Sequence, residues 1–201
     1  MIYITSDQHW GHNAIRWLSS FRSFESLEDM DNHMVHAWNK RVTPADTVYH
    51  IGDIFWHINV ARAILPRLNG NIKLIRGNHD WWLDEIVTRH EGDIWSKIEI
   101  IDPIYRLNFN KTKIWMCHYP LRVWEGSFRG AMMLYGHCHG TIEKDRLPRS
   151  MDMSVDVSGY EPWTVEEVWE HLSKDKIMPE ELRIGGGLKY DHRVSKEGRE
   201  R

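Results

Sequence analysis

Short apolar runs of strand length alternate with segments of helical spacing through the first half of the chain. Between residues 27 and 38, apolar side chains recur at intervals of three and four, which is the period of an amphipathic helix. Ser26 and Asp29 stand where the capping pair of such a helix belongs. Further helical stretches are expected over residues 14–18 and 60–65. The expected strands cover residues 2–5, 47–51 and 72–75, so the first half is predicted to run β-α-β-α-β.

The second half of the chain is dominated by strand-like runs. Asn110 and Lys111 separate two of these runs and are expected to form a hairpin turn. A final helix is predicted over residues 165–172, because Thr164 is followed three residues later by Glu167, as in a capping box. The expected strands cover residues 98–101, 105–109, 114–117, 132–135 and 154–157.

Polar residues of metal-binding type follow five of these apolar runs. The blocks are Asp7-Gln8-His9, Gly52-Asp53, Gly77-Asn78-His79-Asp80, His118 and Gly136-His137-Cys138-His139. Carboxylate and amide oxygens together with imidazole nitrogens suit borderline divalent ions such as Mn, Fe, Zn or Ni, whereas all-oxygen sets suit Mg or Ca. One Gly-Asp pair at a strand end is ordinary turn chemistry, but five blocks in series indicate a two-metal hydrolase site. Asp53 is the natural bridging carboxylate, and the glycines at 52, 77 and 136 permit close backbone approach.

Composition narrows the classes of protein that the chain fits. At 201 residues and 41% hydrophobic, it suits one domain, predicted over residues 1–185, with a charged and flexible tail over residues 186–201. The net charge of −3 gives no sign of a nucleic-acid or membrane partner. No secretion signal or bilayer-length apolar run is visible, so a cytoplasmic protein is expected. Cys117 and Cys138 are too few for a disulfide framework and are expected to be reduced, buried packing residues.

The order and strand-end placement of the five blocks resemble those of the calcineurin-like metallophosphoesterases. The resemblance is to the short bacterial and bacteriophage members that lack accessory domains, and it covers about residues 1–169. It implies an α/β (α+β) fold, a four-layer αββα sandwich in which two mixed β-sheets are flanked by helices. The first half of the chain would supply one sheet and the strand-rich second half the other.

The resemblance also implies ligands for two divalent transition-metal ions, with Mn expected to support activity in vitro. One ion would be held by Asp7, His9, Asp53 and His139. The other would be held by Asp53, Asn78, His118 and His137. A hydroxide bridging the two ions would attack phosphorus, while His79 would protonate the leaving oxygen and Asp80 would orient and charge His79.

Two departures from the family pattern bear on activity. Asp80 stands where many members carry Glu, which keeps the carboxylate but shortens its reach, so activity is expected to survive. Gly52-Asp53 continues as Ile54-Phe55-Trp56, without the acid and the arginine that Ser/Thr protein phosphatases carry just downstream. This second departure argues against protein phosphatase activity.

Residues near the blocks are candidates for substrate contacts. An indole ring close to the metals could stack a nucleobase, although core packing is the commoner use of Trp. His12 and Arg122 could contact a phosphate oxygen, and solvated surface roles fit both equally well. The indole candidates are Trp10, Trp56, Trp81 and Trp82.

The leading functional prediction is a dimetal phosphodiesterase that acts on small nucleotide or cyclic phosphate esters. The chain leaves no evident lid, which favours accessible diesters, and a phosphomonoesterase of the same family is the alternative. A non-catalytic metal-binding scaffold is a third possibility. A scaffold protein of this fold has lost the catalytic histidine, whereas this chain retains His79. A nuclease is disfavoured, because the acidic balance offers no extended surface for a nucleic-acid backbone.

Overall fold

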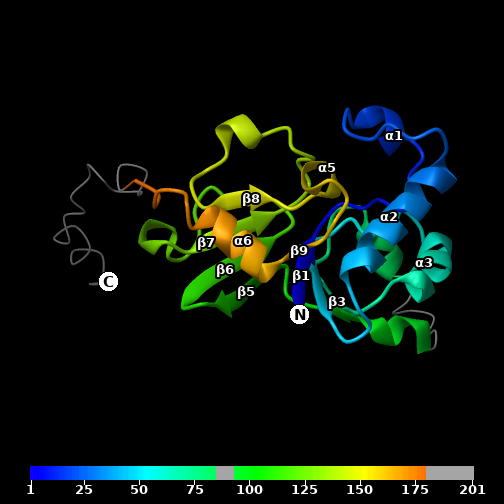
Figure 1. Ribbon diagram of the computed structural model, residues 1–201, viewed down its shortest axis with the longest axis horizontal. Helices are drawn as coiled ribbons and strands as arrows, with labels where there is room; N and C mark the ends of the chain where they lie inside the picture. Colours follow the sequence, from blue (N-terminus) through cyan, green and yellow to red (C-terminus); the bar gives the residue numbers. More distant parts are fainter. Residues whose placement is uncertain (85–92, 180–201) are drawn as a thin grey trace, which may run out of the picture.

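Two β-sheets form the centre of the molecule in the computed structural model, which describes residues 1–84 and 93–179 (Figure 1). The first sheet has the strand order β4-β3-β2-β1-β9. Its first four strands are parallel, and β9 pairs antiparallel with β1. The strands are β1 (Ile2–Thr5), β2 (Thr47–His50), β3 (Asn71–Leu74), β4 (Ile98–Ile100) and β9 (Trp163–Thr164).

The second sheet has the strand order β5-β6-β7-β8. Strands β5 and β6 form an antiparallel hairpin, and β6, β7 and β8 are parallel. The hairpin turn at Asn110 and Lys111 is confirmed, with both residues in the left-handed region at φ 46° and 62°. Both sheets are therefore mixed, as the resemblance implies. The strands are β5 (Ile104–Phe109), β6 (Thr112–Cys117), β7 (Met132–Tyr135) and β8 (Ser150–Asp152).

The two sheets pack through alternating side chains. Met132 and Leu134 of β7 join Ile4 of β1 in an apolar cluster between the sheets, while the intervening Met133 faces the outer side of the second sheet. The outer side of the first sheet packs against helices α2 (Leu27–Arg41) and α3 (Ile58–Ile64). Helix α6 (Val165–Leu172) contributes its buried side chains to the cluster between the sheets.

Local signals predicted the longer helices well. Ser26 accepts a hydrogen bond from the Asp29 amide at 3.0 Å, and α2 begins there as expected. The predicted capping box of α6 is present, with Thr164 and Glu167 bonded reciprocally. Helix α1 (Ile15–Leu18) lies within the helical stretch predicted over residues 14–18.

One predicted strand is wrong, and two short strands were missed. Residues 154–157 were expected to be extended, but α5 (Val155–Ser158) is helical and only Ser154 makes an isolated bridge, to Ser6. Four residues that alternate polar and apolar side chains, as Ser154 to Val157 do, are too few to distinguish a strand from a helical turn. Strands β8 and β9 have three and two residues, and their pairing partners define them rather than any local pattern.

The division of the sheets along the chain also differs from expectation. Strand β4 was expected among the strands of the second sheet, and strand β9 lies near the end of the described chain, but both belong to the first sheet. The predicted tail, residues 186–201, lies outside the described residues, as does the end of the domain predicted over residues 1–185. Among residues 1–84 and 93–179, no helix is both long and apolar enough to cross a membrane.

Candidate metal centre

The five polar blocks converge at the carboxyl ends of parallel strands from both sheets. Asp7, Asp53 and Asn78 follow β1, β2 and β3 of the first sheet, whereas His118 and His137 follow β6 and β7 of the second. Backbone hydrogen bonds join the loops to one another. They include Asp7 N–H to Gly52 C=O, His9 N–H to Asp53 C=O and Gly136 N–H to His118 C=O, each at 3.0 Å.

The side chains of these loops form two groups suited to a metal ion. Asp7, His9 and His139 form one group, and Asp53, His118 and His137 form the other, with the potential ligand atoms of each group within 4.8 Å of one another. The Asn78 carboxamide oxygen lies 3.0 Å from His118 Nε2 and 2.8 Å from His137 Nδ1, and therefore joins the second group.

Asp53 lies between the two groups. Its Oδ2 atom is 3.5 Å from His9 Nε2 in the first group and 3.5 Å from His118 Nε2 in the second. A carboxylate oxygen at this position is placed to contact ions in both groups. Its other oxygen accepts the backbone N–H of His79 at 2.7 Å, which fixes the carboxylate orientation.

Backbone strain is concentrated at these residues. Nine described non-glycine residues have positive φ, and five of them belong to the two groups. Such a conformation is uncommon outside glycine and is retained where surrounding contacts enforce it, often at functional sites. In the loops after β1 and β7 the strained residues are two positions apart. The five are Asp7, His9, Asp53, His137 and His139.

Two glycines explain how closely the loops approach. A Cβ atom at Gly136 would collide with the side chains of Ser6 and Asp7, and one at Gly77 would collide with the Asp53 carboxylate. The close approach expected from the sequence is therefore present at both positions. Any larger residue would push one ligand loop away from the other.

The residues fit divalent ions. His9 is 2% exposed, and neither of its ring nitrogens has a hydrogen-bond partner, although two carboxylates face its Nε2 atom. Burial lowers the pKa of His9 despite those carboxylates, so the ring is neutral and keeps a lone pair for a metal. A buried imidazole with free nitrogens beside carboxylates is the donor set that transition metals prefer.

His79 and Asp80 have separate environments. His79 is half-buried beside the metal groups, with its ring centroid 5.2 Å from His9 and 4.8 Å from Trp56. Asp80 is fully buried, and its carboxylate accepts the backbone N–H groups of Gly77 and Asp53 at 2.8 Å each. Among the described contacts, no hydrogen bond joins Asp80 to the His79 ring. Asp80 instead ties together the loops after β2 and β3.

Sequence reasoning missed a buried ion pair behind the metal groups. The Asp156 carboxylate, on α5, accepts a hydrogen bond from His139 Nδ1 at 2.6 Å and two hydrogen bonds from Arg22 at 2.8 Å each. Arg22 also donates to the backbone carbonyls of Asp7 and Gln8. Burial by itself would raise the pKa of Asp156, but the hydrogen bonds from Arg22 and His139 outweigh it and hold that pKa below its usual range.

The consequence of this pair is a fixed orientation for His139. With Nδ1 donating to Asp156, Nε2 is the free nitrogen, and it lies 3.7 Å from Asp7 Oδ1 within the first metal group. Hydrogen-bonded carboxylates commonly orient metal-binding histidines in this way. The signal available in the sequence was a single carboxylate at Asp156 between two valines.

A second buried network, also missed, supports the loop after β1. His50 is fully buried, and burial lowers its pKa to about 3, so it is neutral. Its Nδ1 accepts the Gly52 N–H at 3.2 Å, which leaves Nε2–H to donate to the Gln8 carboxamide oxygen. Gln8 in turn donates to Thr5 at 2.9 Å. These hydrogen bonds join the loop after β1 to the loop after β2.

A cavity of about 580 Å³ opens onto both metal groups. His12 lines it and stacks on Trp56 with ring centroids 3.6 Å apart, and burial lowers the pKa of His12 to about 4. Trp10 and Trp82 are fully buried in the core and cannot line a substrate site.

The remaining substrate candidates and the cysteines lie elsewhere. Trp81 is 44% exposed and packs edge-on against His57 rather than lining the cavity. Arg122 is exposed and borders a separate hollow on the second sheet. Cys117 is buried and Cys138 half-buried, both are free thiols, and both pack in the cluster on the outer side of the second sheet.

Comparison with known proteins agrees with this geometry. The family model of the calcineurin-like phosphoesterases matches residues 1–178. The chain belongs to this family. The two mixed sheets with flanking helices are thus the fold of a calcineurin-like phosphoesterase.

Relatives of this calcineurin-like phosphoesterase occur in archaea and phages. An uncharacterized protein of Methanocaldococcus jannaschii is 30% identical over 188 residues, which cover 88% of this chain and 94% of that protein. The Gene 66 protein of Mycobacterium phage D29 is 25% identical over 77% of this chain and 87% of its own length. A solved Aquifex aeolicus protein of unknown function has the same fold, with a TM-score of 0.67 and 24% identity over 85% of this chain and 98% of its own.

Proposed function

We propose that this protein is a dimetal phosphodiesterase that hydrolyses small nucleotide or cyclic phosphate esters. The observation that carries the proposal is the position of Asp53 Oδ2, 3.5 Å from a histidine of each metal group. Two ions that share a carboxylate can act together on one phosphate, whereas separate ions cannot. Manganese is the ion proposed to support activity in vitro, since mixed oxygen and imidazole ligands suit it.

The two groups of side chains described above give the proposed ligands of each ion. Asp7, His9, His139 and Asp53 would hold one ion, and Asp53, Asn78, His118 and His137 would hold the other. When bound, the ions supply positive charge for the phosphoryl oxygens and acidify water.

His79 is proposed as the general acid. His79 lines the cavity beside the metal groups. Its backbone N–H donates to Asp53 Oδ1, which holds the His79 backbone close to the proposed bridging carboxylate. Its ring makes no hydrogen bond among the described contacts, so it is free to donate a proton to the leaving oxygen. General acids of this kind contribute about 10² to 10⁴ in rate.

The charge of the cavity favours diesters over monoesters. None of the described residues that line it is Lys or Arg. A monoester carries a second negative charge that would need such a partner beyond the metals, whereas a diester carries one charge. The cavity also extends past the metal groups to Leu18 and Phe21, which leaves room for a second ester group.

The test uses purified protein with Mn²⁺ on bis(4-nitrophenyl) phosphate and 4-nitrophenyl phosphate. We expect turnover of both, with the larger kcat/KM on the diester. His79→Ala should slow an ester with an alkoxide leaving group about 10² to 10⁴-fold, and should slow nitrophenolate release far less, because nitrophenolate needs little protonation.

His36→Ala is the matched control, because His36 is exposed on α2 and lies outside the cavity. Its rates should equal those of the wild type on both esters. No turnover of either aryl ester by metal-loaded protein would refute the proposed function. Equal losses on both leaving groups in His79→Ala would remove His79 as the acid.

A further inference from the structure

One wall of the cavity is apolar and open to solvent. It is formed by α1 and the residues after it, where Leu18 is 74% exposed and Phe21 is 53% exposed, and both line the cavity. Large apolar side chains at a cavity opening lose contact with water only when a ligand covers them. The wall faces the same space as the two metal groups.

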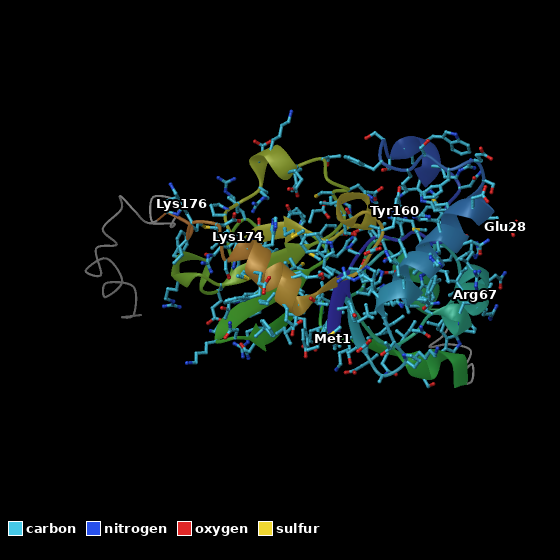
Figure 2. The ribbon with its side chains drawn as sticks, in the orientation of Figure 1. Met1, Glu28, Arg67, Tyr160, Lys174 and Lys176 are labelled. Atoms are coloured by element: carbon cyan, nitrogen blue, oxygen red, sulfur yellow. The ribbon has the colours of Figure 1, made fainter. Side chains whose placement is uncertain are left out.

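Phe21 is held against the metal-binding loop. A Cβ atom built on Gly140, the residue after His139, would lie 3.5 Å from the Phe21 ring. Tyr160, which is labelled in Figure 2, follows α5. Its hydroxyl donates a hydrogen bond to the Phe21 carbonyl at 2.6 Å. The hydrogen bond therefore fixes the Phe21 backbone, and the ring lies beside Gly140, the residue after a candidate metal ligand.

The base of the wall is anchored to the same buried ion pair that orients His139. Ser19 donates to Asp156 at 2.7 Å, and Arg22 donates two hydrogen bonds to Asp156. Arg22 is 1% exposed and also donates to the backbone carbonyls of Asp7 and Gln8, so its charge is buried and does not face the cavity. The wall is thus fixed in place and electrically neutral.

We propose that Leu18 and Phe21 form a subsite for an uncharged aromatic group of the phosphoester substrate, such as an aryl ring or a nucleobase. This inference rests on the proposed function, since it names the half of the substrate that the metal groups do not hold. The phosphate would face the metals, and the ring would lie on Phe21.

Two physical arguments support an uncharged ring. Stacking of a planar ring on an aromatic side chain is tolerant of the exact ring and commonly changes affinity by about fivefold or more. An additional anionic group on the ring would have no Lys or Arg among the described lining residues to offset its desolvation. The subsite should therefore select a substrate whose only negative charge is at phosphorus.

The test measures binding by calorimetry with Mn²⁺-loaded protein, so it does not depend on turnover. The probes are methylphosphonate, phenylphosphonate and 4-carboxyphenylphosphonate, which share a head group that cannot be hydrolysed at the P–C bond. We expect phenylphosphonate to bind about tenfold more tightly than methylphosphonate. The carboxylated ring should lose most of that advantage.

Variants then assign the preference to the wall. Phe21→Ala should reduce the phenyl-to-methyl affinity ratio to about one or two, Leu18→Ala should reduce it in part, and Phe21→Tyr should retain it. Trp17→Ala is the matched control, because Trp17 is 69% exposed on the same helix but does not line the cavity. Its ratio should equal that of the wild type.

The outcomes separate this inference from the proposed function. A wild-type ratio near one, no binding of methylphosphonate or phenylphosphonate, or an equal loss in Trp17→Ala would overturn the subsite. A ring preference that disappears in Phe21→Ala, in a protein that hydrolyses no ester, would leave the subsite standing and remove the proposed activity.

Discussion

Asp156 shows how a residue outside the metal groups controls their geometry. It accepts a hydrogen bond from His139 on one side and two from Arg22 on the other, and all three side chains are largely buried. Burial lowers the pKa of His139, yet the hydrogen bond to Asp156 and the charge of Asp7 raise it above its ordinary value. The carboxylate thus makes His139 a more basic candidate ligand.

Asp156→Asn should weaken metal binding and folding together. The amide keeps the shape but removes the charge that orients His139, so Mn²⁺ affinity should fall about 10 to 100-fold by calorimetry. Arg22 would lose its counter-charge while buried, and the free energy of unfolding should fall by about 3 kcal/mol in the metal-free protein.

Asp175→Asn serves as the control for that prediction. Asp175 also pairs with an arginine, Arg146, at 2.6 Å, but the pair is partly exposed and Asp175 lies outside both metal groups. Its Mn²⁺ affinity should remain that of the wild type. An unchanged affinity in Asp156→Asn would show that His139 is oriented by other contacts.

At the scale of single elements, the formation of α6 depends on a local capping box and on packing against strands distant in the sequence. Its capping box satisfies the amides at its start, and Val165, Val168 and Leu172 pack between the two sheets. The cap and the apolar spacing are local, which is why this helix and α2 could be predicted. Helix α5 could not, because its conformation depends on Ser6 and Arg22 from the start of the chain.

Thr164→Ala should destabilise the fold without changing the metal groups. Loss of the hydroxyl that accepts the Glu167 amide at 3.1 Å should lower the free energy of unfolding by about 1 kcal/mol, which denaturant titration would measure. Thr164→Ser keeps an accepting hydroxyl and should lose less. Equal losses in both variants would mean that the Thr164 methyl, rather than the cap, carries the effect.

At the scale of the whole molecule, the metal groups join the two sheets. Asp7 and Asp53 follow strands of the first sheet, whereas His118, His137 and His139 follow strands of the second. Each group in fact contains residues from both sheets. An ion bound in either group therefore links the two halves of the fold, and its binding energy adds to the stability of the folded state.

Saturating Mn²⁺ should accordingly raise the thermal midpoint. At a free concentration of about 100 times Kd, binding adds about 2.7 kcal/mol, which corresponds to a rise of roughly 5 to 10 °C for a chain of this size. A chelator should reverse the rise, as followed by circular dichroism. In Asp53→Asn most of the rise should disappear, and a full rise in that variant would contradict a shared role for Asp53.

The candidate metal ligands and the longer helices could be predicted from the sequence, because both predictions depend on near neighbours. A polar block after an apolar run, or a cap followed by helical spacing, is complete within a few residues. The left-handed backbone at Asp7 and Asp53, the apolar wall at Phe21 and the pairing of Arg22 with Asp156 across 134 positions needed the folded chain. These features are determined by packing between distant segments. No interaction within a short peptide would offset the backbone strain at Asp7 and Asp53 or the buried charges of Arg22 and Asp156.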